Sequence, residues 1–249
     1  MILKRLLVSC VAVAMTVSLV PAVAFAKELD DASVVTVDAV PALLNGDAGS
    51  AGQSSPGHDE GKCGAKLDYK LDAGTGTLYI FGSGSMWNWG SKGSPFYAMK
   101  DKIKKISISG ATSIGAYAFQ GLKNISTVTI PSSVKTIGNY AFYGSGVKKI
   151  TGGSKVTSIG TRAFSLCTKL TSFSISSKYL KKIGSSCFSS ASRLKTISIK
   201  KTTKLSKSGV KKSLKGSRIK TVKVKKSKKL RYTIYFLKKN SGKKVKVRS

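Results

Sequence analysis

A six-residue phrase that recurs four times constrains the fold of this chain more than any other feature of its sequence. The phrase has the form Ile-Gly-x-x-Ala-Phe, with Cys in place of Ala in the last copy. Its copies occupy residues 114–119, 137–142, 159–164 and 183–188, so the steps are 23, 22 and 24 residues. A period in this range is typical of a solenoid, in which each unit buries its apolar side by stacking on its neighbours. The sequence therefore predicts a β-rich solenoid.

A second pattern, apolar-x-x-apolar-x-apolar, lies between the copies of the first. Its members are Ile103/Ile106/Ile108, Ile125/Val128/Ile130, Leu170/Phe173/Ile175, Leu194/Ile197/Ile199 and Ile219/Val222/Val224. Side chains alternate between the two faces of a strand, so the last two apolar residues of each member point into the core. The pattern predicts one short strand per coil, with neighbouring strands about 4.8 Å apart. The third coil is expected to have a weaker strand, because Gly152 stands at an apolar position.

The outward positions of these strands form two columns when they are read coil by coil. The column between the two inward residues is Ser107, Thr129, Thr151, Ser174, Ser198, Lys223 and Lys246. The column two residues earlier is Lys105, Thr127, Lys149, Ser172, Thr196, Thr221 and Lys244. We expect a sheet face lined by hydroxyl groups, which are replaced by lysines toward the C-terminus. Such a face is a binding surface rather than a pocket.

Two residues of the repeated phrase have expected structural roles. The phenylalanines at 119, 142, 164 and 188 recur once per coil on the side opposite the strands, so we expect them to stack as a buried aromatic spine. The glycines at 115, 138, 160 and 184 follow the isoleucine, and we expect the backbone to turn there with a positive φ.

The first segments of the chain do not carry the repeat. Residues 1–26 have a basic start, an apolar core at 6–20 and a small-x-small cleavage site at 24–26, which predicts a signal peptide. The apolar core is too short for a stable anchor, so no transmembrane segment is expected in the mature protein, residues 27–249. Residues 27–62 hold most of the acidic residues together with Gly, Ser and Pro, which predicts a disordered linker.

Residues 63–101 predict a module that caps the first coil. Leu67 to Leu71 alternate with polar residues, a Gly-rich turn follows, and Thr77 to Phe81 are β-prone, which together indicate a hairpin. Trp87 and Trp89 come next, and we interpret them as cover for the exposed coil. The alternative is that one of them stacks against a carbohydrate.

The repeats proper are expected over 102–199, followed by degenerate basic repeats and a C-terminal cap over 200–249. Residues 205–210 lie in the fifth slot of the phrase, 22 residues after Ile183, but lack both Ile-Gly and Ala-Phe. The valines at 222, 224, 245 and 247 keep the alternation of strands in this part. Lysines at an open edge also stop a strand from pairing with another molecule.

The charge of the chain is strongly asymmetric. All ten acidic residues lie between Glu28 and Asp101, whereas Lys102 to Ser249 hold 36 Lys or Arg and no Asp or Glu. Like charge on this scale repels itself unless counter-ions or ligands gather around it. Edge protection explains only part of this excess, so the asymmetry indicates a polyanionic partner.

Residues for catalysis or for cofactor binding are scarce. The mature chain has three cysteines, Cys63, Cys167 and Cys187, and their spacing matches no zinc motif, so we expect them to be buried and structural. The single histidine, His58, lies in the linker, and the region after Asp101 offers neither carboxylate nor imidazole for acid and base chemistry. Neither a catalytic site nor a cofactor is therefore expected.

The repeated phrase, the L-x-x-I-x-I stretches and the Pro-Ser-Ser-Val at 131–134 together resemble the BspA-like bacterial leucine-rich repeats. The entry segment from Cys63 to Tyr97 and the lysine-rich ending at 211–245 also resemble segments found in that family. The resemblance covers residues 63–249. It implies leucine-rich repeat coils of 22–24 residues and a surface or secreted interaction protein, since some relatives act as adhesins. The chain differs from such relatives by lacking a recognisable wall-sorting motif, choline-binding repeats and an enzyme domain.

Two functions remain open at this point. In the first, a secreted or noncovalently surface-associated protein binds an anionic polymer, such as teichoic acid or a glycosaminoglycan, with nucleic acid as a weaker version. The expected contacts are Lys200, Lys220, Lys223, Lys225, Lys244, Lys246 and Arg248. In the second, an adhesin binds an extracellular or host protein through the hydroxyl-lined sheet. The expected contacts are then Thr129, Thr151, Ser174 and Ser198.

Overall fold

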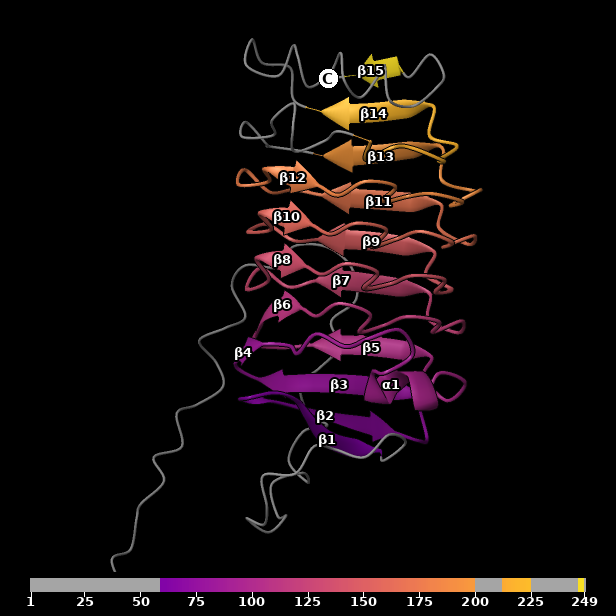
Figure 1. Cartoon of the computed structure of the whole chain (residues 1–249). Helices are drawn as coiled ribbons and strands as arrows, with labels where there is room; N and C mark the ends of the chain where they lie inside the picture. Colours follow the sequence, from indigo (N-terminus) through magenta and orange to yellow (C-terminus); the bar gives the residue numbers. More distant parts are fainter. Residues whose placement is uncertain (1–58, 200–211, 225–245, 249) are drawn as a thin grey trace, which may run out of the picture. The chain divides into compact units, whose positions relative to one another are not determined.

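The computed structural model describes residues 59–199, 212–224 and 246–248. Within these residues the chain is a solenoid of short parallel strands. Its coils are stacked on one another, and an antiparallel hairpin cap covers the N-terminal end of the stack (Figure 1). The predicted fold class is therefore confirmed. The predicted signal peptide, 1–26, lies outside the described residues, as do nearly all of the predicted linker and much of 200–249.

Three sheets organise these residues. The cap sheet has the order β1-β2-β3-β5, the minor sheet β12-β10-β8-β6-β4 and the main sheet β15-β14-β13-β11-β9-β7. The cap sheet contains β1 (Glu60–Gly64), β2 (Leu67–Asp72), β3 (Thr77–Gly82) and β5 (Lys105–Ile108). The minor sheet contains β4 (Gly84–Ser85), β6 (Ala111–Ile114), β8 (Thr136–Ile137), β10 (Ser158–Ile159) and β12 (Lys182–Ile183). The main sheet contains β7 (Thr127–Ile130), β9 (Lys149–Gly152), β11 (Ser172–Ile175), β13 (Thr196–Ile199), β14 (Thr221–Val224) and β15 (Lys246–Arg248).

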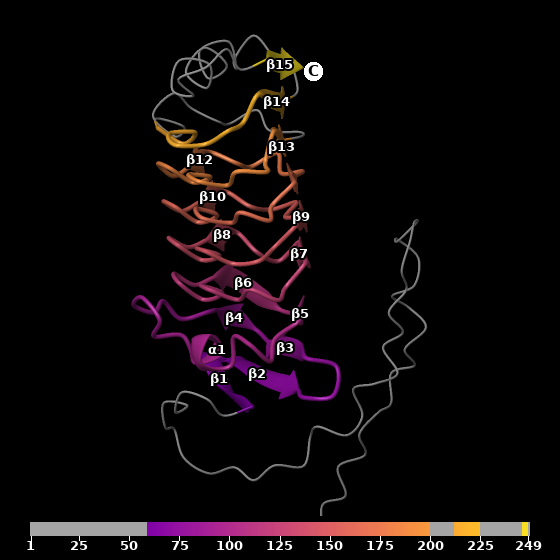
Figure 2. The ribbon, with the colours of Figure 1, turned by 90° about the vertical axis from the view of Figure 1, so that its right-hand side faces the viewer.

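From β7 to β12 each coil passes once through the main sheet and once through the minor sheet (Figure 2). The main sheet is in parallel register, with Val128 opposite Ile150 and Phe173 opposite Ile197, so the apolar positions of successive coils meet inside. The isoleucines of the repeated phrase form the matching row in the minor sheet, where Ile137 pairs with Ile159. These side chains are at most 1% exposed. The two apolar patterns of the sequence are therefore the two inner walls of one core.

The cap sheet is the predicted hairpin with β1 added beside β2 and β5 added beside β3. β2 and β3 pair from Leu67 opposite Gly82 to Asp72 opposite Thr77. The Asp72 carboxylate accepts hydrogen bonds from the Thr75 hydroxyl at 2.7 Å and the Gly74 N–H at 2.9 Å, which fix the turn and lower the pKa of Asp72. β1 begins at Glu60, inside the segment predicted to be linker.

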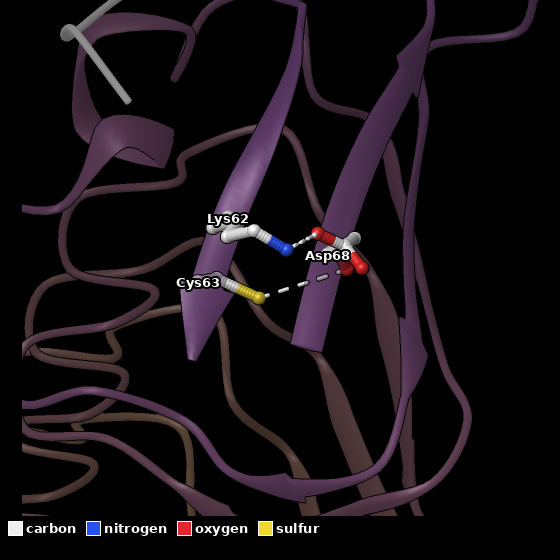
Figure 3. Close-up of polar contacts among 3 residues, drawn as sticks. All are labelled: Lys62, Cys63 and Asp68. Atoms are coloured by element: carbon white, nitrogen blue, oxygen red, sulfur yellow. Dashed lines mark hydrogen bonds and ion pairs between the residues drawn. The ribbon is translucent and has the colours of Figure 1, made fainter. Parts of the chain in front are cut away.

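An ion pair and a thiol join β1 to β2. Lys62 Nζ lies 3.0 Å from an Asp68 carboxylate oxygen, and the neighbouring Cys63 thiol donates to the Asp68 carbonyl oxygen at 3.7 Å (Figure 3). Lys62 and Asp68 are opposite each other in the strand register. The cap closes the core with α1 (Pro95–Ala98), whose N-cap Ser94 donates its hydroxyl to the Ala118 carbonyl oxygen at 2.8 Å.

The predicted aromatic spine is present, and it is longer than predicted. Phe119, Phe142, Phe164 and Phe188 are buried, with successive ring centroids 5.1, 5.2 and 5.9 Å apart. Phe96 of α1 stacks on Phe119 at 5.6 Å, so the cap extends the spine by one ring. Ring pairs at these separations are favourable beyond their buried area, which couples each coil to the next.

The structure contradicts the expectation that the glycines of the repeated phrase have a positive φ. Positive φ values are absent at 115, 138, 160 and 184 and occur instead two residues later in each phrase. These left-handed residues are Tyr117, Tyr140, Arg162 and Ser186, with φ between 50° and 57°. Glycine is needed for space, because a Cβ on Gly138 would lie 2.5 Å from the backbone nitrogen of Ala116 in the preceding coil.

The fifth copy of the phrase lies later than predicted. The turn formed by Ser186 to Ser190 has its counterpart at 212–216, where Lys212 and Gly216 again have positive φ. The Ser190 N–H donates to the Gly216 carbonyl oxygen at 2.9 Å. Leu214 is fully buried and stands where the other coils have phenylalanine. Residues 205–210, which the sequence analysis assigned to the fifth slot, lie outside the described residues, and Leu214 follows Phe188 by 26 residues.

The three cysteines of the described chain are buried and unpaired, as predicted. Burial raises the pKa of the Cys63 thiol to about 12 and that of Cys167 to about 11. It also raises the pKa of Cys187, which packs in the core where other coils have alanine. These thiols remain protonated near neutral pH and behave as small apolar groups.

Candidate binding surface

The outer face of the main sheet carries the predicted hydroxyl columns. Thr127, Lys149 and Ser172 lie opposite one another on successive strands. Thr129 lies opposite Thr151, with their hydroxyl oxygens 3.4 Å apart, and Ser174 lies opposite Ser198. Side chains at alternate strand positions point outward, so the hydroxyl residues at these positions line up from strand to strand. Threonine is also favoured in strands because it is β-branched.

The hydroxyls of this face are unequally accessible. Thr129 is exposed, and Thr151 and Ser174 are half-buried. The Oγ atom of Ser198 is buried and has no hydrogen-bond partner among the residues that the structure describes. Thr129, Thr151 and Ser174 therefore present the hydroxyl part of the surface, and Ser198 contributes little to it.

The register of the C-terminal strand differs from the one predicted for the outward columns. In β15, Lys246 pairs with Thr221 and Arg248 pairs with Lys223, so both columns shift by two residues. Val247 rather than Val245 therefore lies opposite Val222. The strand alternation has a period of two, so it cannot distinguish registers that differ by two residues.

The remaining predicted column positions and contacts fall into three groups. Lys220 and Lys223 are exposed at the C-terminal end of the described coils. Ser107 pairs with Tyr79 in the cap sheet and does not belong to the main sheet. The remaining predicted contacts lie outside the described residues: Lys200, Lys225 and Lys244.

A row of basic residues flanks the main sheet where its strands begin, and the sequence patterns had singled out only two of its members, Lys149 and Lys220. Backbone hydrogen bonds stack these positions, since Lys148 N–H donates to the Ser126 carbonyl oxygen at 2.6 Å and Lys220 N–H to the Lys195 carbonyl oxygen at 2.8 Å. The members are all exposed and are called the basic edge: Lys148, Lys149, Lys169, Arg193, Lys195, Arg218 and Lys220. Most of them stand directly beside the first apolar residue of the second sequence pattern, which is Leu170, Leu194 or Ile219, and Lys148 and Lys149 follow Val147. The recurrence of Lys and Arg at these positions, once per coil, is the sequence signal that could have identified this row.

The basic edge has no internal counter-charge. Four ion pairs occur among the described residues, and all lie at the cap: Lys62–Asp68, Lys70–Glu60, Lys100–Asp101 and Lys102–Asp59. The sequence has no Asp or Glu after Asp101, so no side-chain carboxylate can neutralise the coils from within. Their positive potential is screened only by salt or by a bound anion.

The described chain offers little for catalysis. No group of three or more His, Cys, Asp or Glu side chains in residues 59–199, 212–224 and 246–248 is placed to hold a metal ion. The three thiols are buried with raised pKa values, so none is a ready nucleophile. Over the same ranges, no helix has the length and apolar character needed to cross a bilayer.

In a comparison with known families, residues 93–233 match, in six copies, the family described as BspA type leucine rich repeat region. This match covers more than half of the chain and includes the strands from β5 to β14. A comparison with curated proteins found no match.

Solved structures similar to the chain are bacterial leucine-rich repeat proteins. One from Eubacterium ventriosum is 24% identical with a TM-score of 0.54, and the match covers 67% of this chain and 44% of that one. A leucine-rich repeat protein of T. pallidum is 20% identical with a TM-score of 0.41, covering 64% and 68%. The pneumococcal vaccine antigen PcpA is 21% identical with a TM-score of 0.35, covering 69% and 51%. The first similarity supports the fold, and the chain spans less than half of that protein's length.

Proposed function

Because the chain belongs to the family of BspA-type leucine-rich repeat proteins, we propose that it is an exported, non-catalytic binding protein whose basic coils attach it to an anionic polymer. Proteins of this family are commonly secreted or located at the cell surface. Leucine-rich repeats generally serve as interaction modules rather than as enzymes. The repeats thus provide an extended surface, and the charge on that surface selects the partner.

The observation that carries the proposal is the basic edge. Seven exposed cations recur coil by coil along one border of the main sheet, without a carboxylate in the same coils. A linear polyanion laid along the solenoid would meet one or two cations per coil. Binding would release the counter-ions condensed on both partners, which is the driving term for such complexes.

The chemistry of the edge favours a flexible anionic polymer over duplex DNA. Teichoic acid and glycosaminoglycans are single chains that can follow a row of cations. The described part of the edge has no aromatic side chains interleaved with its lysines, as a surface for stacking bases would require. Nucleic acid is accordingly the weaker candidate.

The test is binding of residues 27–249 to immobilised teichoic acid, heparin and duplex DNA, with host matrix proteins alongside, over a salt series. Polyanion binding that falls steeply with salt supports the proposal. Binding to none of the three polyanions at low salt contradicts it.

The hydroxyl-lined face of the main sheet supports a second candidate, a protein-binding adhesin. Thr129, Thr151 and Ser174 lie on a flat strand surface and present both donors and acceptors. Binding to one matrix protein that persists at high salt supports this candidate. Thr151→Arg would then abolish binding by obstructing the face, whereas the same change at Lys135, on a loop outside the main sheet, would leave it intact.

A further inference from the structure

Two hollows on the minor-sheet side of the solenoid meet at one residue. The larger, about 460 Å³, extends over β8 and β10, and the smaller, about 410 Å³, lies beside β4. Asn88 lines both. Each volume falls within the range of small-molecule sites. The two hollows therefore adjoin at Asn88 and are together called the groove, which lies on a different sheet from the basic edge.

Two asparagines along this groove have fixed side chains, and Ala116 occupies the same position in the coil between them. The Asn88 side-chain oxygen accepts the Ala116 N–H at 2.8 Å, and the Asn139 oxygen accepts the Thr161 N–H at 2.8 Å. These bonds determine which way each amide points. Neither amide nitrogen is hydrogen-bonded to any of the residues that the structure describes, and both side chains are exposed. The groove therefore has two oriented N–H donors, which are separated by the coil that has Ala116 at this position.

Strand residues add further polar groups to the lining of the larger hollow. Thr136, Ser158 and Lys182 lie opposite one another on β8, β10 and β12, and all three line the larger hollow. Gly138 and Gly160 leave its floor without side chains. The lining therefore combines donors and acceptors, has one ammonium group at Lys182 and contains no carboxylate.

An exposed tryptophan lies in the smaller hollow. Trp87 is 38% exposed, and its backbone is held by an N–H···O bond of 2.8 Å to the Cys63 carbonyl oxygen. Its neighbour Trp89 instead packs against Phe96 with ring centroids 5.8 Å apart. Packing of the cap therefore accounts for Trp89 but does not explain the exposed ring of Trp87.

This combination matches the chemistry of a sugar. A pyranose has an apolar C–H face that packs on a flat aromatic ring, and a rim of hydroxyls that each donate and accept hydrogen bonds. Trp87 supplies the ring, and the asparagines, Thr136 and Ser158 supply the polar partners. We propose that this groove binds an uncharged oligosaccharide, extended along the coils from Trp87 toward Lys182. The site is separate from the basic edge and does not depend on the proposed polyanion binding.

Intrinsic fluorescence gives a direct test, because the chain has only two tryptophans. Residues 27–249 would be titrated with chitotetraose, cellotetraose and mannotetraose at high salt, which suppresses binding to polyanions. We expect at least one probe to change the Trp87 emission with saturation. Trp87→Ala should weaken binding of that probe at least tenfold, measured by calorimetry. Ser158→Arg places a large side chain in the groove and should also weaken binding of that probe at least tenfold.

Two controls separate this proposal from folding defects and from the polyanion site. Circular dichroism would check that both variants fold, and Lys220→Gln on the basic edge should leave oligosaccharide affinity unchanged. Absence of binding by all three probes would overturn the proposal. So would an affinity that Trp87→Ala and Ser158→Arg do not alter.

Discussion

A Cβ atom on Gly138 would lie 2.5 Å from the backbone nitrogen of Ala116, so the two coils touch there through backbone alone. The same contact recurs between Gly160 and Asn139 at 2.5 Å and between Gly184 and Thr161 at 2.3 Å. The glycine of the repeated phrase thus sets the close spacing of the coils.

Gly138→Ala should destabilise the solenoid by about 2–3 kcal/mol, because backbone atoms of the adjacent coil cannot move aside for the methyl group. The measurement is urea unfolding followed by circular dichroism. Gly90→Ala is the matched control, since a Cβ at Gly90 meets nothing within 4 Å. Equal stability of the two variants would show that the close contact does not govern coil spacing.

Phe142→Ala should cost about 3–5 kcal/mol, because it leaves a cavity between two stacked rings of the spine. Phe81→Ala removes the same side chain from a site where it is 38% exposed. That control should cost less than about 1 kcal/mol. Unfolding midpoints of the two variants check the difference, and a small loss for Phe142→Ala would argue against the spine as a source of stability.

The buried thiols should make stability fall at alkaline pH. Their pKa values are raised in the folded chain, so the contribution is complete below the ordinary thiol pKa and is lost as the pH rises above it. For Cys187 we expect a loss of about 1–2 kcal/mol between roughly pH 9 and pH 10.5. Cys187→Ala removes this term and matches the alanine of other coils.

Urea unfolding of the wild type and of Cys187→Ala, at both pH values, isolates the thiol from the titration of lysines. The wild type should lose more stability than the variant as the pH rises. Equal losses would mean that the thiol is not protected by burial. In the folded wild type, a thiol-specific reagent at neutral pH should label the cysteines only as fast as the chain opens.

The sequence was sufficient for those parts of the fold that depend on apolar periodicity. Phe119 to Phe188 repeat with the coils, and any solenoid must bury them, so the spine followed directly. The structural role of the glycines could not be predicted in this way. Gly138 is required because the backbone of Ala116, 22 residues earlier, lies close to it, and not because its own turn needs a glycine. The register of β15 and the place of the turn at 212–216 depend on loop lengths that no local pattern encodes.

The candidate sites likewise include features that follow from a local sequence pattern and features that depend on contacts between distant residues. The hydroxyl columns were predictable because outward positions alternate along strands. The basic edge lies at and just before the first residues of the strands, so a reading of the outward strand positions found Lys149 but not Lys148 or Lys195. The groove requires Asn88 of the cap and Asn139 of a later coil to face one hollow, and only the folded chain brings them together.

Removing part of the basic edge should weaken polyanion binding without affecting the fold. The variant Lys148→Gln, Lys195→Gln, Lys220→Gln changes three exposed side chains. The control Lys135→Gln, Lys155→Gln, Lys181→Gln makes the same change of net charge on loops outside the main sheet. Long-range attraction falls equally in both, so a difference between them reports direct contacts.

The most direct measurement is the dependence of heparin affinity on salt for residues 27–249 and these two variants. The account predicts that the basic-edge variant reduces the slope of log affinity against log salt by about two to three. The control variant should lower the slope by less than about one. Equal slopes for all three proteins, or a larger loss in the control, would contradict the basic edge as the polyanion-binding surface.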